Sequence, residues 1–355
     1  MRNGRPPGRR SRSDRRKAAV LVAAGVLMSL GGGGVASAVD DSTTSPQRSS
    51  PTGSHIVEAR TNDGRNFCVD VYSAAMNRIV QVEVQRARAA GPTPMLYLLN
   101  GGGGGEDAAT WQRQTDVLEF LADKQVNVVQ LVGGKFSYYT DWRAPDPVLG
   151  VNRWRTFLTE ELPPLLDAEF RGNGLNAIAG VSMSATSALQ LAIDRPDLYR
   201  SIASYSGCAQ ISDPYGHSLV ATVVGVGGGN VENMYGPITH PDWAANDPFV
   251  HADRLRGKNI FISSGNGLPG GHDTLGDPHL MAPGPGGLAN QVVLGGIIEA
   301  AAHTCAVNLR NRLHGLGIPA TYDIDGNGSH SWGYWQDMFK RSWPVLAAGL
   351  GLPIR

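Results

Sequence analysis

The sequence predicts an α/β fold with a mostly parallel sheet of about eight strands and helices on both faces. Short apolar and β-branched runs recur from His55 onward, and longer amphipathic stretches separate them. Strands that alternate with helices in this way form parallel sheets covered on both sides. The later runs are continuously apolar, as strands buried on both faces must be. We therefore expect one α/β domain over residues 55–355.

The expected strands are short apolar runs, of which the first two alternate polar and apolar residues like antiparallel edge strands. They are Ile56–Arg60, Ile79–Gln85, Met95–Leu99, Val126–Val132, Ala177–Val181, Ser201–Tyr205, Asn259–Ser263 and Ala320–Ile324. The expected helices are Trp111–Ala122, Trp154–Leu166, Ala185–Asp194, Ile297–His314 and Trp335–Leu346. Apolar residues at every fourth position of the fourth helix, such as Cys305 and Leu309, predict one buried face.

The first 38 residues have the order of an export signal. A basic stretch ends at Lys17, an apolar run covers Ala18–Leu30, and Ala36-Ser37-Ala38 resembles a cleavage site. The apolar run is shorter than the roughly 20 residues that span a bilayer, and no second stretch of spanning length is evident. Residues 39–54 are rich in Ser, Thr and Pro and predict a disordered linker. We expect the remaining protein to be secreted or held in the cell envelope.

The charge distribution argues against nucleic acid as a partner. The chain has 31 Lys and Arg against 31 Asp and Glu, but residues 1–38 hold eight basic residues and one acid. The rest of the chain therefore carries a net charge of −7. A protein that binds a polyanion needs its positive charge in the folded part.

Three cysteines in an exported chain allow one disulfide and one unpaired thiol. We favour a bond between Cys208, at the end of a strand-like run, and Cys305, in a helix-like run. Cys68 lies near the start of the domain. The alternative is three buried thiols.

The stretch Asn176–Leu189 contains the most informative motif. An apolar strand runs into Gly180-Val181-Ser182-Met183-Ser184, and a helix pattern follows at once. This is the strand–turn–helix context of the G-x-S-x-G nucleophile elbow, with Ser184 in place of the second glycine. The motif predicts the α/β-hydrolase fold with Ser182 as its nucleophile. The alternative is a serine that only caps a helix.

A serine nucleophile needs amide donors for the oxyanion, and two candidates follow from the elbow. In this fold one donor comes from the loop after an inner strand and the other from the residue after the nucleophile. The strand Met95–Leu99 runs into five glycines, Gly101–Gly105. We therefore predict an oxyanion hole formed by the backbone amides of Gly102 and Met183.

The general base and its acid should follow later in the chain, in the order Ser, acid, His. His330 lies in a Gly-rich loop directly after the last expected strand and is the predicted base. Two acids remain open. Asp273 lies in the loop after Asn259–Ser263, and Glu299 lies at the start of the helix Ile297–His314.

Several stretches between Val57 and Trp343 resemble the secreted mycolyltransferases of the antigen 85 type, within the esterase branch of the α/β-hydrolases. They occur in the family's order and are Tyr97–Gly101, Gly133–Trp142, Trp154–Pro163, Gly180–Met183, Trp243–Pro248, Ser264–Gly267 and Gly328–Trp335.

The resemblance implies a triad of Ser182, His330 and an acid on the helix before the last strand, which favours Glu299 over Asp273. It places the oxyanion donor at Gly102. Two positions that hold trehalose in the best-known members fall on Asn100 and Gly103, where this sequence departs from the family's Asp and Arg. The resemblance also implies substrate contacts at Trp332 and an acyl-chain wall over Leu219–Val226, beginning at Leu219.

The resemblance implies an exported acyltransferase that moves a mycolyl group from an acylated trehalose or similar donor to a sugar hydroxyl of trehalose or arabinan. The nearer alternative is a secreted carboxylesterase that transfers the acyl group to water. A more distant alternative is a non-catalytic wall- or matrix-binding relative. No metal or organic cofactor is expected, because no Cys/His cluster with metal-ligand spacing is evident and the glycine run lacks the Lys of a P-loop.

Overall fold

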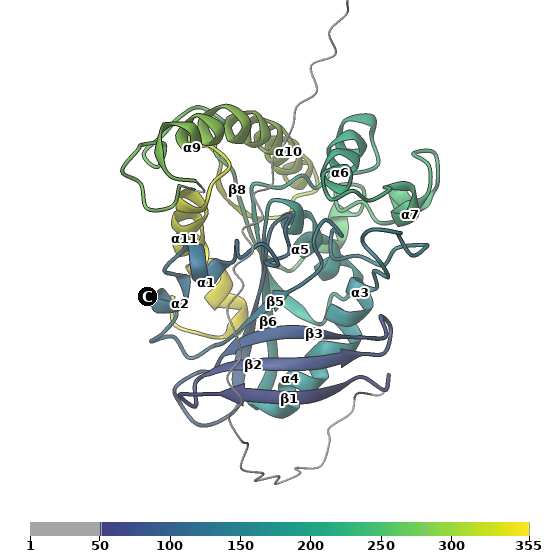
Figure 1. Cartoon of the computed structure of the whole chain (residues 1–355), viewed down its shortest axis with the longest axis vertical. Coiled ribbons are helices and arrows are strands. Elements are labelled where there is room, and N and C mark those ends of the chain that lie inside the picture. The colour runs from purple at the N-terminus through teal and green to yellow at the C-terminus, as the bar shows by residue number, and fades with distance from the viewer. Residues whose placement is uncertain (1–49, 51, 281, 355) are drawn as a thin grey trace, which may run out of the picture. The chain divides into compact units, whose positions relative to one another are not determined.

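A twisted sheet of nine strands runs through the centre of the domain in the computed structural model, which describes residues 50, 52–280 and 282–354. The strand order is β1-β2-β3-β5-β4-β6-β7-β8-β9 (Figure 1). The strands are β1 His55–Thr61, β2 Asn66–Ser73, β3 Arg78–Gln85, β4 Thr93–Leu99, β5 Asn127–Val132, β6 Gly172–Val181, β7 Tyr199–Tyr205, β8 Asn259–Ser263 and β9 Thr321–Asp323.

The first three strands form an antiparallel meander, and β3 pairs antiparallel with β5. From β5 to β9 all pairs are parallel, so the carboxyl ends of these strands meet at one edge of the sheet. The predicted α/β class with a mostly parallel sheet is confirmed. Strand β2 was not predicted, although Phe67, Val69 and Val71 alternate with other residues as in an antiparallel edge strand.

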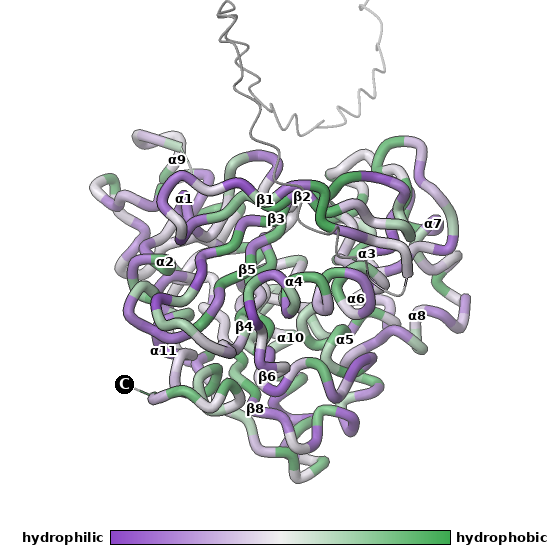
Figure 2. The backbone as a smooth tube through the Cα atoms, turned by 90° about the horizontal axis from the view of Figure 1, so that it is seen from below, coloured by the Kyte–Doolittle hydropathy of each residue, from purple (hydrophilic) through white to green (hydrophobic). Residues whose placement is uncertain are grey.

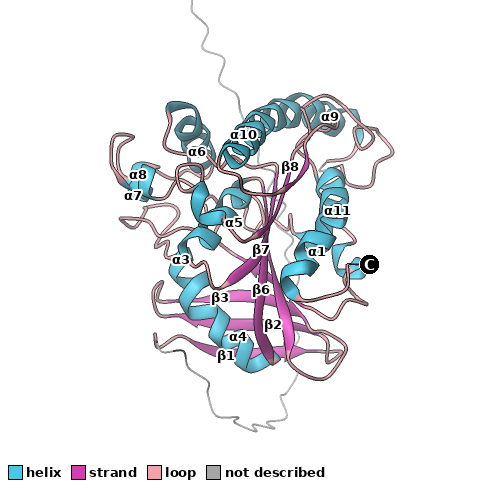
Figure 3. Ribbon diagram, turned by 180° about the vertical axis from the view of Figure 1, so that it is seen from behind, coloured by secondary structure: helices cyan, strands magenta, loops and turns pink. Residues whose placement is uncertain are grey.

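The helices cover both faces of the sheet (Figure 3). On one face lie α3 Trp154–Thr156, the π-helix η1 Phe157–Glu161, α4 Leu162–Phe170, α5 Met183–Asp194, α6 Pro214–Val226 and α10 Gly296–Gly315. On the other lie α1 Trp111–Gln114, α2 Val117–Phe120 and α11 Trp332–Leu350. Smaller elements are α7 Glu232–Tyr235, α8 Asp242–Ala245, η2 Ala252–Leu255, α9 Gly284–Asn290 and the π-helix η3 Gln291–Gly295.

Two hydrophobic cores, one on each face, hold these layers together. On β4, Met95, Tyr97 and Leu99 pack into one core, while Leu96 and Leu98 pack into the other. This alternation explains why the central strands are apolar throughout. Hydrophilic residues instead occupy many of the peripheral loops (Figure 2).

The expected helices are present with changed boundaries. The run Trp111–Ala122 is split into α1 and α2, because the chain turns at Thr115 and Asp116. The run Trp154–Leu166 continues to Phe170 through a π-helical segment. Helix α6 begins where the Asp213 carboxylate accepts hydrogen bonds from the Tyr215 and Gly216 amides, with Pro214 in the first turn.

The predicted signal peptide, residues 1–38, and most of the predicted linker, residues 39–54, lie outside the described residues. Ser54, at the end of that linker, is buried, and its hydroxyl oxygen accepts a hydrogen bond from the Ala74 amide at 2.9 Å. Ser54 therefore belongs to the folded domain.

The helical run Gly284–Gly315 is long and apolar enough to cross a membrane by length and composition, which the sequence analysis did not anticipate. Of the residues in its apolar 18-residue window, 39% are buried within the protein. Its buried side carries Glu299, Cys305 and Leu309 toward the sheet. We therefore interpret this run as a helix of the α/β domain.

A disulfide joins Cys208, just after β7, to Cys305 on α10, which is the pair favoured from the sequence. Cys68 is unpaired and half-buried. The bond closes a loop with a sequence separation of 97 residues and fastens α10 to the edge of the sheet. In the chain-entropy model such a loop contributes roughly 4–5 kcal/mol to stability.

Replacing both Cys208 and Cys305 with Ala should lower the free energy of unfolding by about 2–5 kcal/mol, since the unfolded chain regains its freedom. Denaturant unfolding measures this change. The Cys68→Ala variant is the matched control and should change stability much less. Equal stability of the double variant and the wild type would contradict the prediction.

Candidate active site

Ser182 sits on a sharp turn between β6 and α5 at the carboxyl edge of the sheet. Its backbone has φ 58° and ψ −122°, a conformation that non-glycine residues rarely adopt. The turn needs Gly180, because a Cβ there would lie 2.1 Å from the Ser184 carbonyl oxygen. The structure therefore has the strained geometry of a nucleophile elbow, with the serine hydroxyl held out from the sheet.

Ser184, which replaces the second glycine of the usual motif, stabilises the elbow through the hydrogen bonds of its hydroxyl. It is fully buried, and its hydroxyl oxygen accepts a hydrogen bond from the Val181 amide at 2.9 Å. The hydroxyl proton faces the carbonyl oxygens of Leu99 and Val181, at 3.1 and 3.0 Å. The serine side chain thus links the turn to the neighbouring strand β4, which a glycine could not do.

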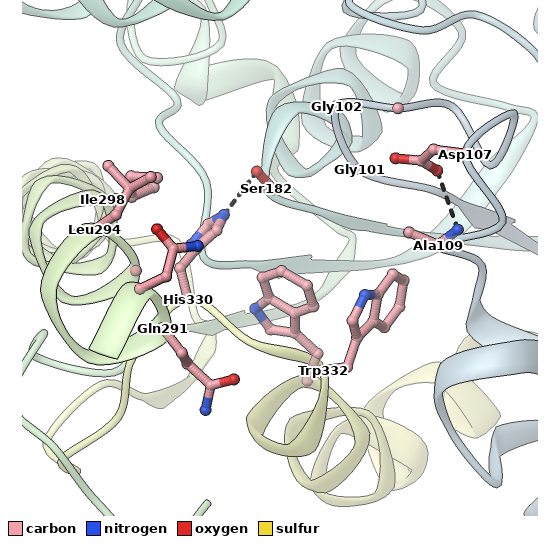
Figure 4. Close-up of a pocket in the computed structure, with 14 residues that line it drawn as sticks. Gly101, Gly102, Asp107, Ala109, Ser182, Gln291, Leu294, Ile298, His330 and Trp332 are labelled. Atoms are coloured by element: carbon pink, nitrogen blue, oxygen red, sulfur yellow. Dashed lines mark hydrogen bonds between the residues drawn. The ribbon is translucent and has the colours of Figure 1, made fainter. Parts of the chain in front are cut away.

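His330 reaches Ser182 from the loop between β9 and α11. Its Nε2 lies 2.8 Å from the Ser182 hydroxyl oxygen (Figure 4). Two contacts fix the loop and the ring: the His330 amide donates to the Gly295 carbonyl at 3.2 Å, and the ring packs edge-on against Trp335. Nε2 is therefore placed to accept the serine proton.

Glu299, in the first turn of α10, completes the chain of hydrogen bonds. Its Oε2 lies 2.7 Å from His330 Nδ1, and its side chain is 0% exposed. The other oxygen, Oε1, accepts hydrogen bonds from the Gly265 amide at 2.6 Å and the Ser206 hydroxyl at 2.7 Å. The Ser264 hydroxyl lies 3.1 Å from the same oxygen. A buried carboxylate so fully bonded can orient the imidazole and stabilise its protonated form.

Asp273, the other candidate acid, accepts hydrogen bonds from residues around the His330 loop and not from the imidazole. Its carboxylate accepts hydrogen bonds from the hydroxyls of Ser329 and Tyr334 at 2.5 and 2.7 Å, from Gln291 at 2.9 Å and from the Gly270 amide at 2.9 Å. Burial acts to raise the pKa of Asp273, but these hydrogen bonds together hold the pKa below its ordinary value. The geometry thus brings Glu299, and not Asp273, to His330.

The two predicted oxyanion donors belong to the glycine loop that lines the cleft and to the first turn of α5. Gly102 lines the cleft at Ser182, and its carbonyl is fixed by the Phe136 amide at 2.7 Å. Met183 is the first residue of α5, where amides have no acceptor within the helix. Within the described part of the chain, neither the Gly102 nor the Met183 amide donates to another protein atom.

A cleft of about 260 Å³ opens in front of the serine. The glycine loop and Asp107 line one side, and Leu294 and Ile298 line the side next to His330 (Figure 4). The full lining is Gly101, Gly102, Gly103, Asp107, Ala109, Ser182, Asn290, Gln291, Leu294, Gly295, Ile298, His330, Trp332 and Trp335.

The predicted substrate contacts divide into two groups. Gly103 and Trp332 line the cleft as expected. Asn100 does not: it is fully buried, its amide donates to the Leu131 carbonyl at 2.8 Å, and its oxygen accepts from the Trp111 amide at 3.3 Å. Its role is to hold the glycine loop against the fold. Leu219 lies half-buried on α6 and is not among the residues that line this cleft.

Three features of the site were not predicted from the sequence. Asp107 has no motif of its own. Leu294 and Ile298 lie four residues apart and, unusually for large apolar side chains, are 46% and 41% exposed. The sequence shows that these two apolar residues lie four positions apart, but it does not show that their side chains are exposed. Ser206, which donates to Glu299, lies directly after β7 in the left-handed region at φ 53°, for which the sequence gives no signal.

Comparisons with known proteins agree with this geometry. The family model described as "Putative esterase" matches residues 73–344. The chain is 32% identical over 292 residues to the diacylglycerol acyltransferase/mycolyltransferase Ag85A of Mycobacterium leprae, covering 80% of this chain and 83% of that protein. It is 31% identical over 292 residues to Ag85B of Mycobacterium avium, again covering 80% of this chain and 83% of that protein.

Solved structures give the same fold. MPT51 (FbpC1) of Mycobacterium tuberculosis superimposes with a TM-score of 0.63 at 25% identity, covering 78% of this chain and 96% of that chain. An S-formylglutathione hydrolase from Agrobacterium tumefaciens has a TM-score of 0.59 at 16% identity, covering 83% and 99%, and supports the fold alone.

The fold and the serine elbow define an α/β-hydrolase of the esterase type. Within that class, the chain belongs to the antigen 85 family of acyltransferases.

Replacing Ser184 with Gly, which restores the usual motif, should lower the free energy of unfolding by about 1–3 kcal/mol, because the buried Val181 amide loses its acceptor. Ser218→Gly, on the exposed part of α6, is the control for the helix cost of glycine. Denaturant unfolding compares the two. If Ser184→Gly costs no more than Ser218→Gly, Ser184 does not support the elbow.

Glu299→Gln should reduce kcat/KM for a p-nitrophenyl ester by about 10³–10⁴, since an amide cannot stabilise the imidazolium or hold its required tautomer. Asp273→Asn, the matched control, should reduce it far less. Steady-state kinetics measures both. A near-normal rate for Glu299→Gln with a large loss for Asp273→Asn would exchange the two roles.

Proposed function

We propose that the protein is an exported serine acyltransferase, which moves a long-chain acyl group through an acyl-enzyme on Ser182 to a sugar hydroxyl. The observation that carries the proposal is the hydrogen-bonded series from Ser182 through His330 to Glu299 at an apolar cleft. The names of the relatives, diacylglycerol acyltransferase/mycolyltransferase, support a mycolyl or similar acyl group.

In the proposed first half-reaction, the Ser182 hydroxyl oxygen attacks the ester carbonyl of the donor while His330 Nε2 takes its proton. The Gly102 and Met183 amides donate to the oxyanion, and each such donor typically contributes about 2.7–4 kcal/mol. Glu299 stabilises the imidazolium. His330 then returns the proton to the leaving alcohol, and the acyl group remains on Ser182.

In the second half-reaction, an acceptor hydroxyl takes the place of the leaving alcohol. His330 removes its proton, the acceptor oxygen bonds to the acyl carbon, and the bond from that carbon to the Ser182 oxygen breaks. His330 then returns the proton to the Ser182 oxygen, which restores the enzyme. The donor we propose is an acylated trehalose or a similar mycolyl ester, and the acceptor is trehalose or an arabinan of the cell wall. Export by the signal peptide at residues 1–38 would bring the enzyme to these substrates.

The apolar side of the cleft supports a long acyl chain as the transferred group. Leu294 and Ile298 line the cleft, and Val293 and Ile297 beside them are 62% and 67% exposed. Together these four side chains form an apolar strip that continues from the cleft onto the surface. Burying such a strip against acyl methylenes contributes about 0.8 kcal/mol per methylene.

The opposite side of the cleft supports a polar acceptor. The Asp107 carboxylate lines it, and only Oδ1 has a partner among the described residues, the Ala109 amide at 3.0 Å. A Cβ at Gly103 would collide with this carboxylate at 2.0 Å, so the absent side chain leaves room for Asp107. We therefore place the sugar hydroxyls next to Asp107, where the resemblance expected an arginine at position 103.

The test is product analysis with a long-chain acyl ester as donor and trehalose or an arabinoside as acceptor. Mass spectrometry should find acylated sugar, in a proportion that rises with sugar concentration, and Ser182→Ala should form none. Free acid as the only product at every sugar concentration would make the protein a carboxylesterase. Failure of the wild type to be labelled at Ser182 by a fluorophosphonate would instead favour a non-catalytic binding protein.

A further inference from the structure

A second cluster of chemically active side chains lies outside the triad, in the long loop between β8 and α9. It consists of His272, Asp277 and His279, and one nitrogen or oxygen from each lies within 4.8 Å of the others. All three residues are partly buried. The triad does not use them.

Both imidazoles present the same ring nitrogen to the same carboxylate. His272 Nδ1 lies 2.6 Å from Asp277 Oδ2, and His279 Nδ1 lies 3.0 Å from Asp277 Oδ1. The far nitrogens also have matching partners, on consecutive residues of α11. His272 Nε2 lies 3.0 Å from Asp337 Oδ2, and His279 Nε2 lies 3.3 Å from Gln336 Oε1.

The roles of the far nitrogens follow from their partners. Gln336 Oε1 also accepts a hydrogen bond from the Asp116 amide at 2.8 Å, which identifies this atom as the amide oxygen. His279 Nε2 therefore donates its proton to Gln336, and a neutral His279 turns its Nδ1 lone pair toward a carboxylate oxygen of Asp277. His272 has a carboxylate at each ring nitrogen, so a neutral ring that donates from Nε2 to Asp337 also turns its Nδ1 lone pair toward Asp277. That contact is repulsive unless a cation lies between the two atoms or each ring carries a second proton.

We propose that Nδ1 of His272, Nδ1 of His279 and the Asp277 carboxylate bind one divalent transition-metal ion, with Zn²⁺ as the best fit. Two imidazoles and one carboxylate suit zinc, whereas Ca²⁺ and Mg²⁺ prefer oxygen ligands alone. Metal-bound histidines commonly donate their other N–H to a carboxylate or carbonyl group, as both do here. A water molecule would supply the fourth ligand.

The ligand atoms need little movement to accept the ion. Tetrahedral zinc bonds of about 2.0–2.1 Å place neighbouring ligand atoms about 3.3 Å apart. The shortest Nδ1–oxygen separation, 2.6 Å, must widen by about 0.7 Å, and ligand atoms up to 4.8 Å apart must move closer by up to about 1.5 Å. The loop residues between them, Asp273 to Gly276, are not regular secondary structure and can take up this change.

The ion would fasten the loop that supports the catalytic histidine. The His272 ring packs edge-on against Tyr334, and Tyr334 and Ser329 both donate to Asp273. Ser329 precedes His330 in the chain. Gln291, which lines the cleft, donates to the His272 carbonyl at 3.1 Å and to Asp273. The site is thus structural, with one wall of the cleft as the part that it stabilises.

The test uses the full chain after dialysis against a chelator, and Zn²⁺ alone as the probe. Equilibrium dialysis with elemental analysis should find one ion per chain, and zinc should raise the Tm. His279→Ala and Asp277→Asn should each weaken binding by about 100-fold or more, and Asp337→Asn by about 10–100-fold. His251→Ala, a histidine outside the cluster, is the matched control. Near-UV circular dichroism checks that each variant is folded.

A second readout does not depend on the variants. Co²⁺ added to the metal-free wild type should give the intense visible absorption of a tetrahedral site with nitrogen and oxygen ligands. Substoichiometric zinc with only weak octahedral cobalt absorption would overturn the proposal and leave two doubly protonated histidines as the explanation. Zinc binding that His279→Ala leaves unchanged would also overturn it. Neither result depends on acyl transfer, so a failure of the metal site would leave the proposed function unaffected.

Discussion

The buried carboxylate of Glu299 is the constraint on which the site depends. A charge with no exposed surface must be fully compensated, and removing one partner of such a group typically costs about 3–5 kcal/mol. The donors come from three different loops: Ser206 follows β7, Gly265 follows β8 and His330 follows β9. Because parallel strands end at one edge of the sheet, the single side chain of Glu299 on α10 can accept hydrogen bonds from all three loops. The same interaction that stabilises the charge therefore also aims His330 at Ser182.

Other features of the fold make sense as supports for this arrangement. The disulfide fastens α10, which carries Glu299, to the segment after β7, which carries Ser206. The π-helix η3 directly precedes α10 and ends at Gly295, whose carbonyl accepts the His330 amide. Ser182 and Ser206 both have positive φ, and each costs of order 1–3 kcal/mol that the surrounding contacts must offset. Both residues place a hydroxyl in the hydrogen-bonded series of the site: Ser182 next to His330 and Ser206 next to Glu299.

Local sequence predicts the parts of this protein that depend on local rules. The elbow at Ser182 and the loop at His330 were predictable because strand, turn and helix signals are contiguous there. Local rules did not separate Glu299 from Asp273, because both lie in suitable positions. The resemblance to the antigen 85 family favoured Glu299, and the hydrogen bond from His330 to Glu299 agrees with it. Asn100 was misassigned because position in a motif does not reveal that a side chain points inward. The cluster of His272, Asp277 and His279 was missed because the acceptors of its far nitrogens lie on α11, distant in the chain. Strand β2, in contrast, has a local alternation of Phe67, Val69 and Val71 that predicts a strand.

The most direct test of the account is a crystal structure of the wild type after reaction with a long-chain alkyl phosphonate. The account predicts a covalent bond at the Ser182 hydroxyl oxygen, with the phosphonyl oxygen accepting hydrogen bonds from the Gly102 and Met183 amides. His330 should remain bonded to Glu299, and the alkyl chain should lie along Leu294 and Ile298. A phosphonate bound to another residue, or a phosphonyl oxygen that faces solvent instead of the two amides, would contradict it.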